Sequence, residues 1–447
     1  MTRALIILAA GKGTRMKSDL PKVLHEVAGA PMLVHAMRSG AALDPARCVI
    51  VAGHGAEAVR EAALAFDETA EIVLQEEQKG TGHAVAMARA ALEGFAGDAC
   101  VLYGDTPFIG AETLERMVAA RAGHDVVVLG FEAADPARYG RLIMEGDSLE
   151  RIVEFKDAKD EERAVTFCNS GIMAADAQLL MELVGELGTQ NASGEYYLTD
   201  VVALARAKGL KATAIACDEA ETMGVNSRAD LAAAEAAFQA RMREEALENG
   251  VTLTAPETVF FAYDTMLGRD CLIEPNVVFG PGVTVETGAR IRAFSHLEGC
   301  HVSRDAVVGP YARLRPGAEI AEAARIGNFV EVKNAVIDEG AKVNHLSYIG
   351  DAHLGRNSNI GAGTITCNYD GVSKHRTEVG ENAFIGSNTM LVAPVRIGDG
   401  ALTASGSVIT KDVEADALAI ARAEQVNKPL MARKLFDILK KMASKGH

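Results

Sequence analysis

A glycine loop near the amino terminus is the first segment whose residues could do chemistry. The segment LAAGKGTRM at residues 8–16 directly follows a short apolar run. Backbone N–H groups of such a loop, together with the start of a following helix, can bind phosphate. Arg15 in the loop and Lys22 in the sequel DLPK add two cations. Loop and cations together predict a clamp for a triphosphate.

The residues of this segment disfavour two other kinds of phosphate-binding loop. The segment lacks the GK[ST] ending of a P-loop, and Met16 stands where a dinucleotide-binding GxGxxG loop has its third glycine. A bare GxG is a weak signal that an ordinary turn would also give. The two cations favour the anion site.

Asp105 is a second candidate because it closes the apolar run ACVLYGD. A carboxylate at the carboxyl end of a buried strand is unfavourable unless a cation lies beside it. The alternative is an aspartate that simply starts a turn.

His345, in VNHLSYIG, is a candidate general base, because histidine suits proton transfer near neutral pH. It lies between Val343 and Ile349, so its side chain is expected to point outward from a repeat, where an isolated histidine is more often an ordinary surface residue. Arg315 and Lys333 are 18 residues apart, which is one coil of that repeat. Their side chains should therefore stack as a grip for phosphate.

Two scaffolds must position these residues. Up to about residue 227, short apolar runs alternate with helix-length segments, which predicts a largely parallel sheet with crossover helices and ligands at the carboxyl ends of its strands. The runs are 4–10, 48–53, 71–75, 99–105 and 125–131. The Ala- and Glu-rich stretch 228–247 predicts a connecting helix with one apolar face, formed by Leu231, Ala234, Phe238 and Met242.

From about residue 267, apolar residues recur at six-residue intervals, which fits a hexapeptide β-helix with these residues in its core. They are Ile273, Phe279, Val285, Ile291, Leu297, Val302, Val308, Leu314, Ile320, Ile326, Val332, Ile337, Val343, Ile349, Leu354, Ile360, Val379, Ile385, Leu391, Ile397 and Ile409. The polar stretch 366–378 predicts a loop that leaves the coil, where chemistry is often placed. Residues 425–447 carry six Lys or Arg against one Asp, which predicts a solvated helix that aids solubility or caps the array.

Composition narrows the function classes. A chain of 447 residues is long enough for two to four domains. Its net charge of −16 disfavours a protein that wraps nucleic acid or lies on an anionic membrane, so small-molecule partners are expected. Seven scattered cysteines without a CxxC pair indicate neither disulfides nor zinc. The first apolar run is too short for a signal peptide or a membrane span, which predicts a cytoplasmic protein.

LAAGKGTRM with PKVLH resembles the sugar nucleotidyltransferases, which join a nucleoside triphosphate to a sugar 1-phosphate and release pyrophosphate. Further motifs resemble, in order and spacing, the bacterial family of bifunctional N-acetylglucosamine-1-phosphate uridyltransferases and glucosamine-1-phosphate acetyltransferases. These are QEEQKGTGHA at 75–84, YGD at 103–105, YGR at 139–141, VEFKD at 153–157, CNSG at 168–171, GEYYLTD at 194–200 and GVNSR at 224–228. The resemblance covers nearly the whole chain.

The resemblance implies an α/β Rossmann-like uridyltransferase domain over residues 1–227, a linker helix over 228–249, a left-handed parallel β-helix acetyltransferase domain over 250–424 and a basic tail over 425–447. It implies Mg²⁺ held by Asp105 and Asn226, with Arg15 and Lys22 offsetting charge during the attack on the α-phosphorus. The implied contacts to UTP and the sugar nucleotide are Leu8, Ala9, Ala10, Gly11, Lys22, Gln75, Gly80, Thr81, Tyr103, Gly104, Asp105, Gly140, Glu154, Asn169 and Asn226.

For the β-helix, the resemblance implies His345 as the base, with glucosamine 1-phosphate held by Arg315, Lys333, Tyr348 and Asn359. The implied acetyl-CoA contacts are Ala362, Asn368, Tyr369, Ser387, Ser405 and Arg422. Relatives commonly have Ala at the position of Ser405, a harmless change if the contact there is through the backbone. The family further implies homotrimers in which some site residues serve a neighbouring chain, and a place in peptidoglycan and lipopolysaccharide precursor synthesis.

The sequence is therefore interpreted as a cytoplasmic enzyme that makes UDP-N-acetylglucosamine from glucosamine 1-phosphate, acetyl-CoA and UTP, without nucleic-acid or membrane partners. One alternative is a monofunctional nucleotidyltransferase with a structural β-helix, such as the glucose-1-phosphate adenylyltransferases. His345, together with Asn368, Tyr369 and Arg422, disfavours it. Another is a non-enzymatic assembly subunit of a translation-initiation exchange factor, which is disfavoured by the presence of Arg15, Lys22, Asp105 and Asn226. A third, nucleic-acid binding by the basic tail, is disfavoured by the overall negative charge.

Overall fold

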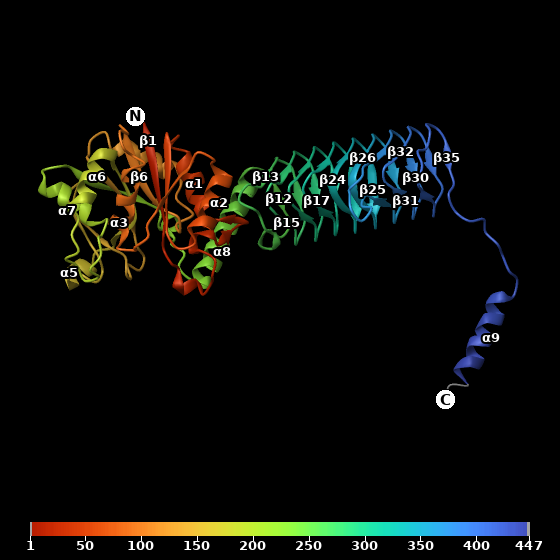
Figure 1. The fold of residues 1–447 in the computed structure, drawn as a ribbon, viewed down its shortest axis with the longest axis horizontal. Coiled ribbons are helices and arrows are strands. Elements are labelled where there is room, and N and C mark those ends of the chain that lie inside the picture. The colour runs from red at the N-terminus through yellow and green to blue at the C-terminus, as the bar shows by residue number, and fades with distance from the viewer. Residues whose placement is uncertain (1, 445–447) are drawn as a thin grey trace. The chain divides into compact units, whose positions relative to one another are not determined.

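The computed structural model describes residues 2–444 and divides into two compact units, one up to Met242 and one from Arg243 onward (Figure 1). Helix α8 (Arg228–Glu248) spans the division, where the sequence predicts a connecting helix. Ala234 and Phe238 on its predicted apolar face are buried. Among the described residues, no helix is long and apolar enough to cross a membrane.

The first unit is built on a nine-stranded sheet whose main order is β11-β7-β10-β6-β1-β4-β5. The five apolar runs predicted as strands are confirmed as β1 (Arg3–Ala9), β4 (Arg47–Ala52), β5 (Glu71–Leu74), β6 (Asp98–Tyr103) and β7 (Val126–Glu132). The sequence did not predict β8 (Arg141–Glu145), β9 (Ser148–Val153), β10 (Phe167–Asp176) and β11 (Ala212–Cys217). β10 runs antiparallel between β6 and β7, so the sheet is largely but not wholly parallel.

Helices cover both faces of this sheet, because successive side chains of a strand point to opposite sides. Along β1, Ile6 belongs to one buried cluster and Leu5 to the other. Helices α3 (Thr81–Ala86), α6 (Ala177–Gly185) and α7 (Asp200–Ala207) pack on the first face, and α1 (Met32–Ala41), α2 (Ala56–Phe66) and α4 (Ala111–Ala120) on the second. The remaining elements are α5 (Asp160–Arg163), the hairpin of β2 (Glu26–Val27) and β3 (Ala30–Pro31), and the 3₁₀ turns η2 (Lys22–Leu24), η3 (Met87–Arg89) and η4 (Glu219–Thr222).

The glycine loop differs from the prediction in one respect. It is followed by a single 3₁₀ turn, η1 (Thr14–Met16), rather than by an α-helix, and the next α-helix starts only at Met32. Gly13 adopts φ 58, and a Cβ there would lie 2.6 Å from Cβ of Lys22. The loop therefore folds closely over Lys22, and only glycine fits at this contact.

The second unit is a parallel β-helix with three faces, as the hexapeptide spacing predicts. The first face contains β12 (Thr252–Leu253), β14 (Leu272–Ile273), β17 (Arg290–Ile291), β20 (Val307–Val308), β23 (Arg325–Asn328), β25 (Lys342–His345), β27 (Asn359–Ile360), β30 (Phe384–Ile385), β33 (Leu402–Thr403) and β35 (Leu418–Ala419). The second contains β15 (Val278–Phe279), β18 (His296–Leu297), β21 (Arg313–Leu314), β28 (Ile365–Cys367), β31 (Met390–Val392) and β34 (Val408–Ile409). The third contains β13 (Met266–Leu267), β16 (Thr284–Val285), β19 (Cys300–Val302), β22 (Ala318–Ile320), β29 (Thr377–Val379) and β32 (Val395–Ile397).

Two longer strands, β24 (Glu331–Ile337) and β26 (Tyr348–Leu354), turn the corner between the second and third faces, because each pairs with strands of both. A short 3₁₀ turn, η5 (Pro256–Thr258), lies near the start of the coil. Every apolar residue of the predicted six-residue series is at most 3% exposed, which confirms the predicted core. Thr366 and Thr403 occupy the same interval and are also fully buried.

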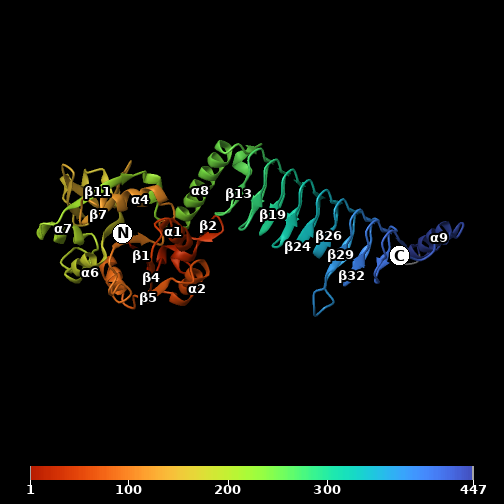
Figure 2. The same cartoon turned by 90° about the horizontal axis from the view of Figure 1, so that it is seen from above.

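The polar insertion leaves the coil between β28 and β29, as predicted, and projects from the β-helix in Figure 2. An isolated bridge between Tyr369 and Lys374 closes it. Beyond the last coil, α9 (Met431–Ala443) lies in the basic tail, and residues 421–444 are all exposed. The predicted solvated helix thus covers Met431–Ala443 of the tail, while residues 445–447 lie outside the described residues.

Candidate active sites

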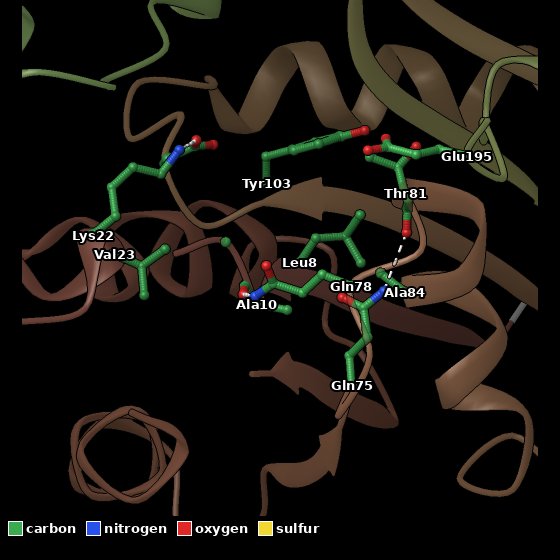
Figure 3. Close-up of a pocket in the computed structure, with 13 residues that line it drawn as sticks. Leu8, Ala10, Lys22, Val23, Gln75, Gln78, Thr81, Ala84, Tyr103 and Glu195 are labelled. Atoms are coloured by element: carbon green, nitrogen blue, oxygen red, sulfur yellow. Dashed lines mark hydrogen bonds and ion pairs between the residues drawn. The ribbon is translucent and has the colours of Figure 1, made fainter. Parts of the chain in front are cut away.

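A cavity of about 320 Å³ opens at the carboxyl ends of β1 and β6, where a sheet of this topology is expected to bind its ligand (Figure 3). It is lined by Leu8, Ala10, Gly11, Lys22, Val23, Gln75, Gln78, Gly80, Thr81, Ala84, Tyr103, Asp105 and Glu195. Nine of these were expected from the sequence to contact the nucleotide. The cavity therefore gathers segments that are far apart in the chain.

Lys22, Asp105 and Asn226 meet at one side of this cavity. The Lys22 ammonium forms an ion pair with Oδ2 of Asp105 and donates to Oδ1 of Asn226 at 3.1 Å. The side chains of Lys22 and Asp105 are only 12% and 18% exposed. Two oxygens from different loops thus converge on a single cation.

The other end of the cavity is organised by Gln75, which is 4% exposed. Its Nε2 donates to the carbonyl of Gly80 at 3.1 Å (Figure 3). Gly80 has φ 110, and a Cβ there would lie 2.5 Å from the carbonyl oxygen of Tyr196. These contacts hold the segment before Thr81 against the cavity wall.

Gly140, Glu154 and Asn169 come together beside the cavity rather than in its lining. The N–H of Asn169 donates to the carbonyl of Gly140 at 2.8 Å, and a Cβ at Gly140 would lie 3.4 Å from Oε1 of Glu154. Burial raises the pKa of Glu154, although Thr199 donates to it at 3.2 Å. Burial and then the charges of Asp105 and Glu154 raise the pKa of Tyr103, which therefore stays neutral between the two carboxylates.

Three residues expected at this site lie elsewhere. Arg15 is exposed and does not line the cavity. Ala9 belongs to the core on the opposite face of the sheet, and the N–H of Gly104 is used by the carbonyl of Leu8 at 3.0 Å. Sequence reasoning named no role for four lining residues, although all of them lie within the motifs that carry the resemblance: Val23, Gln78, Ala84 and Glu195.

Arg315 and Lys333 lie on adjacent coils, as their spacing predicts, because Leu314 pairs with Val332. Lys374 of the inserted loop joins them, although the sequence did not single it out. The nearby ammonium of Lys374, and then the charge of Arg315, lower the pKa of Lys333. Glu331 balances one of these charges through an ion pair of 2.9 Å with Arg315. Three cationic side chains this close together repel one another, so the cluster favours binding of an anion such as phosphate.

His345 lies at the end of β25 and is exposed, as its outward phase predicts. Its Nδ1 hydrogen-bonds Oδ1 of Asn328 at 2.9 Å, from the preceding coil. An amide oxygen at Nδ1 favours the tautomer with the proton on Nδ1, in which Nε2 keeps its lone pair. The contact to Asn328 therefore suits proton uptake at Nε2.

Four of the six residues expected to bind the acetyl donor, Ala362, Ser387, Ser405 and Arg422, form a column that starts at His345. The carbonyl of His345 accepts from the N–H of Gly363 at 3.2 Å, and the carbonyl of Ala362 accepts from Asn388 at 2.7 Å. Below them the carbonyl of Ser387 accepts from Gly406 at 2.8 Å. Nη1 of Arg422 then donates to the carbonyl of Ser405 at 2.9 Å. This contact of Ser405 is through the backbone, so alanine would preserve it.

Tyr348, Asn368 and Tyr369 lie around the start of the inserted loop. Nδ2 of Asn368 reaches the hydroxyl of Tyr348 at 3.4 Å. A Cβ at Gly350 would lie 2.4 Å from that hydroxyl, so this glycine makes room for the ring. Tyr369 is 62% exposed, and Asn359 lies on the first face, paired with Lys342.

Comparison with known proteins supports a nucleotidyltransferase domain in the first unit and a hexapeptide-repeat domain in the second. A family model for the MobA-like NTP transferase domain matches residues 5–169, and one for the six repeats of the bacterial transferase hexapeptide matches residues 376–411. Bifunctional protein GlmU of Ruegeria sp. (strain TM1040) is 71% identical over 447 residues, covering 100% of both chains.

Two further relatives carry the same name. Bifunctional protein GlmU of Ruegeria pomeroyi is 74% identical over 446 residues, covering 100% of this chain and 99% of the relative. That of Cereibacter sphaeroides (strain ATCC 17025) is 68% identical over 439 residues, covering 98% and 97%. With this identity over its whole length, the chain belongs to the GlmU family of bifunctional N-acetylglucosamine-1-phosphate uridyltransferases and glucosamine-1-phosphate acetyltransferases.

Proposed function

We propose that residues 1–227 catalyse uridylyl transfer, that 228–249 serve as the linker helix, and that 250–424 catalyse acetylation of glucosamine 1-phosphate by acetyl-CoA. The product, N-acetylglucosamine 1-phosphate, then reacts with UTP to give UDP-N-acetylglucosamine and pyrophosphate. The observation that carries the proposal is the presence of two separate constellations, the Lys22–Asp105 cavity and the His345 column, in a chain of the GlmU family.

In the first site, an oxygen of the sugar phosphate attacks the α-phosphorus of UTP and pyrophosphate leaves. No nucleophilic side chain is required, because that oxygen is already an anion. Lys22 supplies positive charge beside the phosphates, while Gln75, Gly80 and Thr81 face the nucleotide. Gly140, Glu154 and Asn169 contact the N-acetylglucosamine moiety. Arg15, which is exposed, reaches the phosphates from the solvent side of the loop.

The donor set at Asp105 and Asn226 fits Mg²⁺. Their oxygens already converge on one cation, the Lys22 ammonium, and hard oxygen ligands suit this ion. Among the residues that the structure describes, no cluster of three or more His, Cys, Asp or Glu side chains could hold a metal. Two protein ligands agree with the habit of Mg²⁺ to complete its shell with phosphate and water. When bound, the ion offsets negative charge on the triphosphate.

In the second site, Nε2 of His345 removes a proton as the amine of glucosamine 1-phosphate attacks the thioester carbon of acetyl-CoA. The new C–N bond forms, the C–S bond breaks, and coenzyme A leaves as the thiol after taking up a proton. Arg315, Lys333 and Lys374 hold the phosphate of the acceptor, and Tyr348 and Asn359 contact its sugar. Ala362, Asn368, Tyr369, Ser387, Ser405 and Arg422 bind the acetyl donor.

A coupled assay tests both halves. With glucosamine 1-phosphate, acetyl-CoA, UTP and Mg²⁺ supplied, we expect free thiol, then N-acetylglucosamine 1-phosphate, then UDP-N-acetylglucosamine with pyrophosphate. EDTA should stop only the uridylyl step, because the metal ligands lie in the first unit. Inhibition of thiol release to the same extent would contradict the assignment of the metal to the first site.

We further propose that the chain forms a homotrimer through its β-helix. Phe294, Tyr311 and Phe329 lie on successive coils with 50%, 47% and 56% of their surface exposed. Their rings stack at centroid distances of 4.9 and 5.2 Å. Leu346, beside His345, extends this ladder of exposed apolar side chains and is 61% exposed. Because the ladder is continuous with the acetyl-donor column, a second copy covering it would border the acetyl-transfer site.

Light scattering of the full chain should give three times the chain mass, and Tyr311→Asp should shift it toward the monomer while lowering acetyl transfer. Phe66→Asp serves as the control, because Phe66 is a 39% exposed aromatic residue of the other unit. A wild-type chain that is monomeric and fully active would refute the trimer. We place the protein in the cytoplasm, without nucleic-acid or membrane partners, in keeping with its net charge of −16.

A further inference from the structure

A buried carboxylate lies among the residues of the acetyl-transfer site without a role in the chemistry above. Asp351 follows Tyr348 in β26 and is 9% exposed. Its pKa lies below the usual value. Burial acts in the opposite direction, but hydrogen bonds from Asn334 and Asn368 and the charges of Lys374 and Lys333 outweigh it. Asp351 is therefore ionised and held by specific donors rather than by chance burial.

Each oxygen of Asp351 accepts one side-chain amide. Nδ2 of Asn334, from the preceding coil, donates to Oδ1 at 2.6 Å. Nδ2 of Asn368, from the following coil, donates to Oδ2. A carboxylate can only accept hydrogen bonds, whereas an amide group presents a donor on one side and an acceptor on the other. Asp351 therefore fixes which way round the amide of Asn368 is placed.

Asn368 also anchors the inserted loop. Its backbone carbonyl accepts from the N–H of His375 at 2.8 Å, and its side-chain Nδ2 lies 3.4 Å from the hydroxyl of Tyr348. Lys374 precedes His375 and belongs to the cation cluster with Lys333. The side-chain amide of Asn368 is thus linked to Tyr348 and Asp351, while the backbone of the same residue holds the loop that carries Lys374.

We propose that Asp351 is a positioning residue for acetyl transfer, which turns Nδ2 of Asn368 inward and leaves its Oδ1 to accept an N–H of the acetyl donor. This inference rests on the proposed role of Asn368 at the donor site. With a neutral residue at position 351, the side-chain amide of Asn368 could rotate. Its NH₂ group, rather than its oxygen, would then face the N–H of acetyl-CoA, and the hydrogen bond would be lost. The cost would appear as weaker use of acetyl-CoA.

Asp351→Asn is the informative change, because asparagine has the same shape and tolerates the φ of 47 at this position. We expect kcat/KM for acetyl-CoA to fall about 10- to 100-fold, mainly through KM, the range for losing a hydrogen bond to a charged group. Uridylyl transfer should not change. Asn334→Gly is the matched control, since it removes the other amide from Asp351 and leaves Asn368 in place.

A double-mutant cycle separates positioning from general support of the coil. Asn368→Ala should lower use of acetyl-CoA, and Asp351→Asn combined with it should cause no further loss. If Asp351→Asn matches the wild type, or its effect adds fully to that of Asn368→Ala, the positioning role is wrong while the donor site stands. If Asn368→Ala itself keeps wild-type kinetics, both the donor assignment and the role of Asp351 are overturned.

Discussion

Replacing His345 by alanine should lower acetyl transfer roughly 10²–10⁴-fold, the usual contribution of a general base. In the structure its Nδ1 is engaged by Asn328 at 2.9 Å, so Nε2 is the free base, and alanine removes it while leaving the exposed corner of the coil intact. Uridylyl transfer to supplied N-acetylglucosamine 1-phosphate should stay near wild type, because Lys22 and Asp105 belong to the other unit. Thiol release from acetyl-CoA and pyrophosphate release report the two steps separately.

The control for this variant is His296→Ala. His296 is an exposed histidine on the second face of the same β-helix and has no place in the proposed chemistry. Both variants should melt near the wild-type temperature, since neither side chain is buried. An unchanged rate for a folded His345→Ala variant at neutral pH would refute the base assignment. Asn328→Ala should give a smaller loss, because it frees the imidazole without removing it.

The fold could be predicted where buried positions produce a regular pattern of apolar residues in the sequence. Runs such as ALIILAA are buried on both sides of the sheet, and the six-residue series fills a prism one residue wide. The strands that escaped prediction are those with mixed burial. β9 alternates buried and partly exposed residues, and β11 is an alanine-rich edge strand. Thr366 and Thr403 were missed because polar residues gave no signal at core positions.

The sites were predictable to the extent that their geometry follows from regular stacking. One coil of 18 residues is enough to place Arg315 beside Lys333. The inserted loop obeys no period, so the approach of Lys374 to that pair had no sequence signal. The same holds for Asp351, whose partners become neighbours only through the coil before it and the loop after it. At the glycine loop, the expectation of an α-helix failed because the chain makes a single 3₁₀ turn around Lys22.

Asp105→Ala should reduce uridylyl transfer by about 10²–10³-fold, the range for losing one electrostatic contact to the developing charge. Acetyl transfer should be unaffected. Two roles of Asp105 can be told apart, because its carboxylate could serve as a metal ligand or only as the partner of Lys22. As a ligand, its loss should raise the Mg²⁺ concentration needed for half-maximal rate, and so should Asn226→Ala. Lys22→Ala should lower the rate without that shift.

The matched control is Glu150→Ala, which removes an ion pair of 2.8 Å with Arg206 in the same unit, away from the cavity lining. It should leave both the rate and the Mg²⁺ requirement unchanged. If Asp105→Ala and Lys22→Ala gave equal losses with the wild-type Mg²⁺ dependence, and the double variant lost no more, Asp105 would act only through the lysine. If only Asp105→Ala and Asn226→Ala raise the Mg²⁺ concentration needed for half-maximal rate, both side-chain oxygens must be ligands of the ion. The Lys22 ammonium, which lies between them, carries a single charge and cannot replace a divalent ion at the triphosphate.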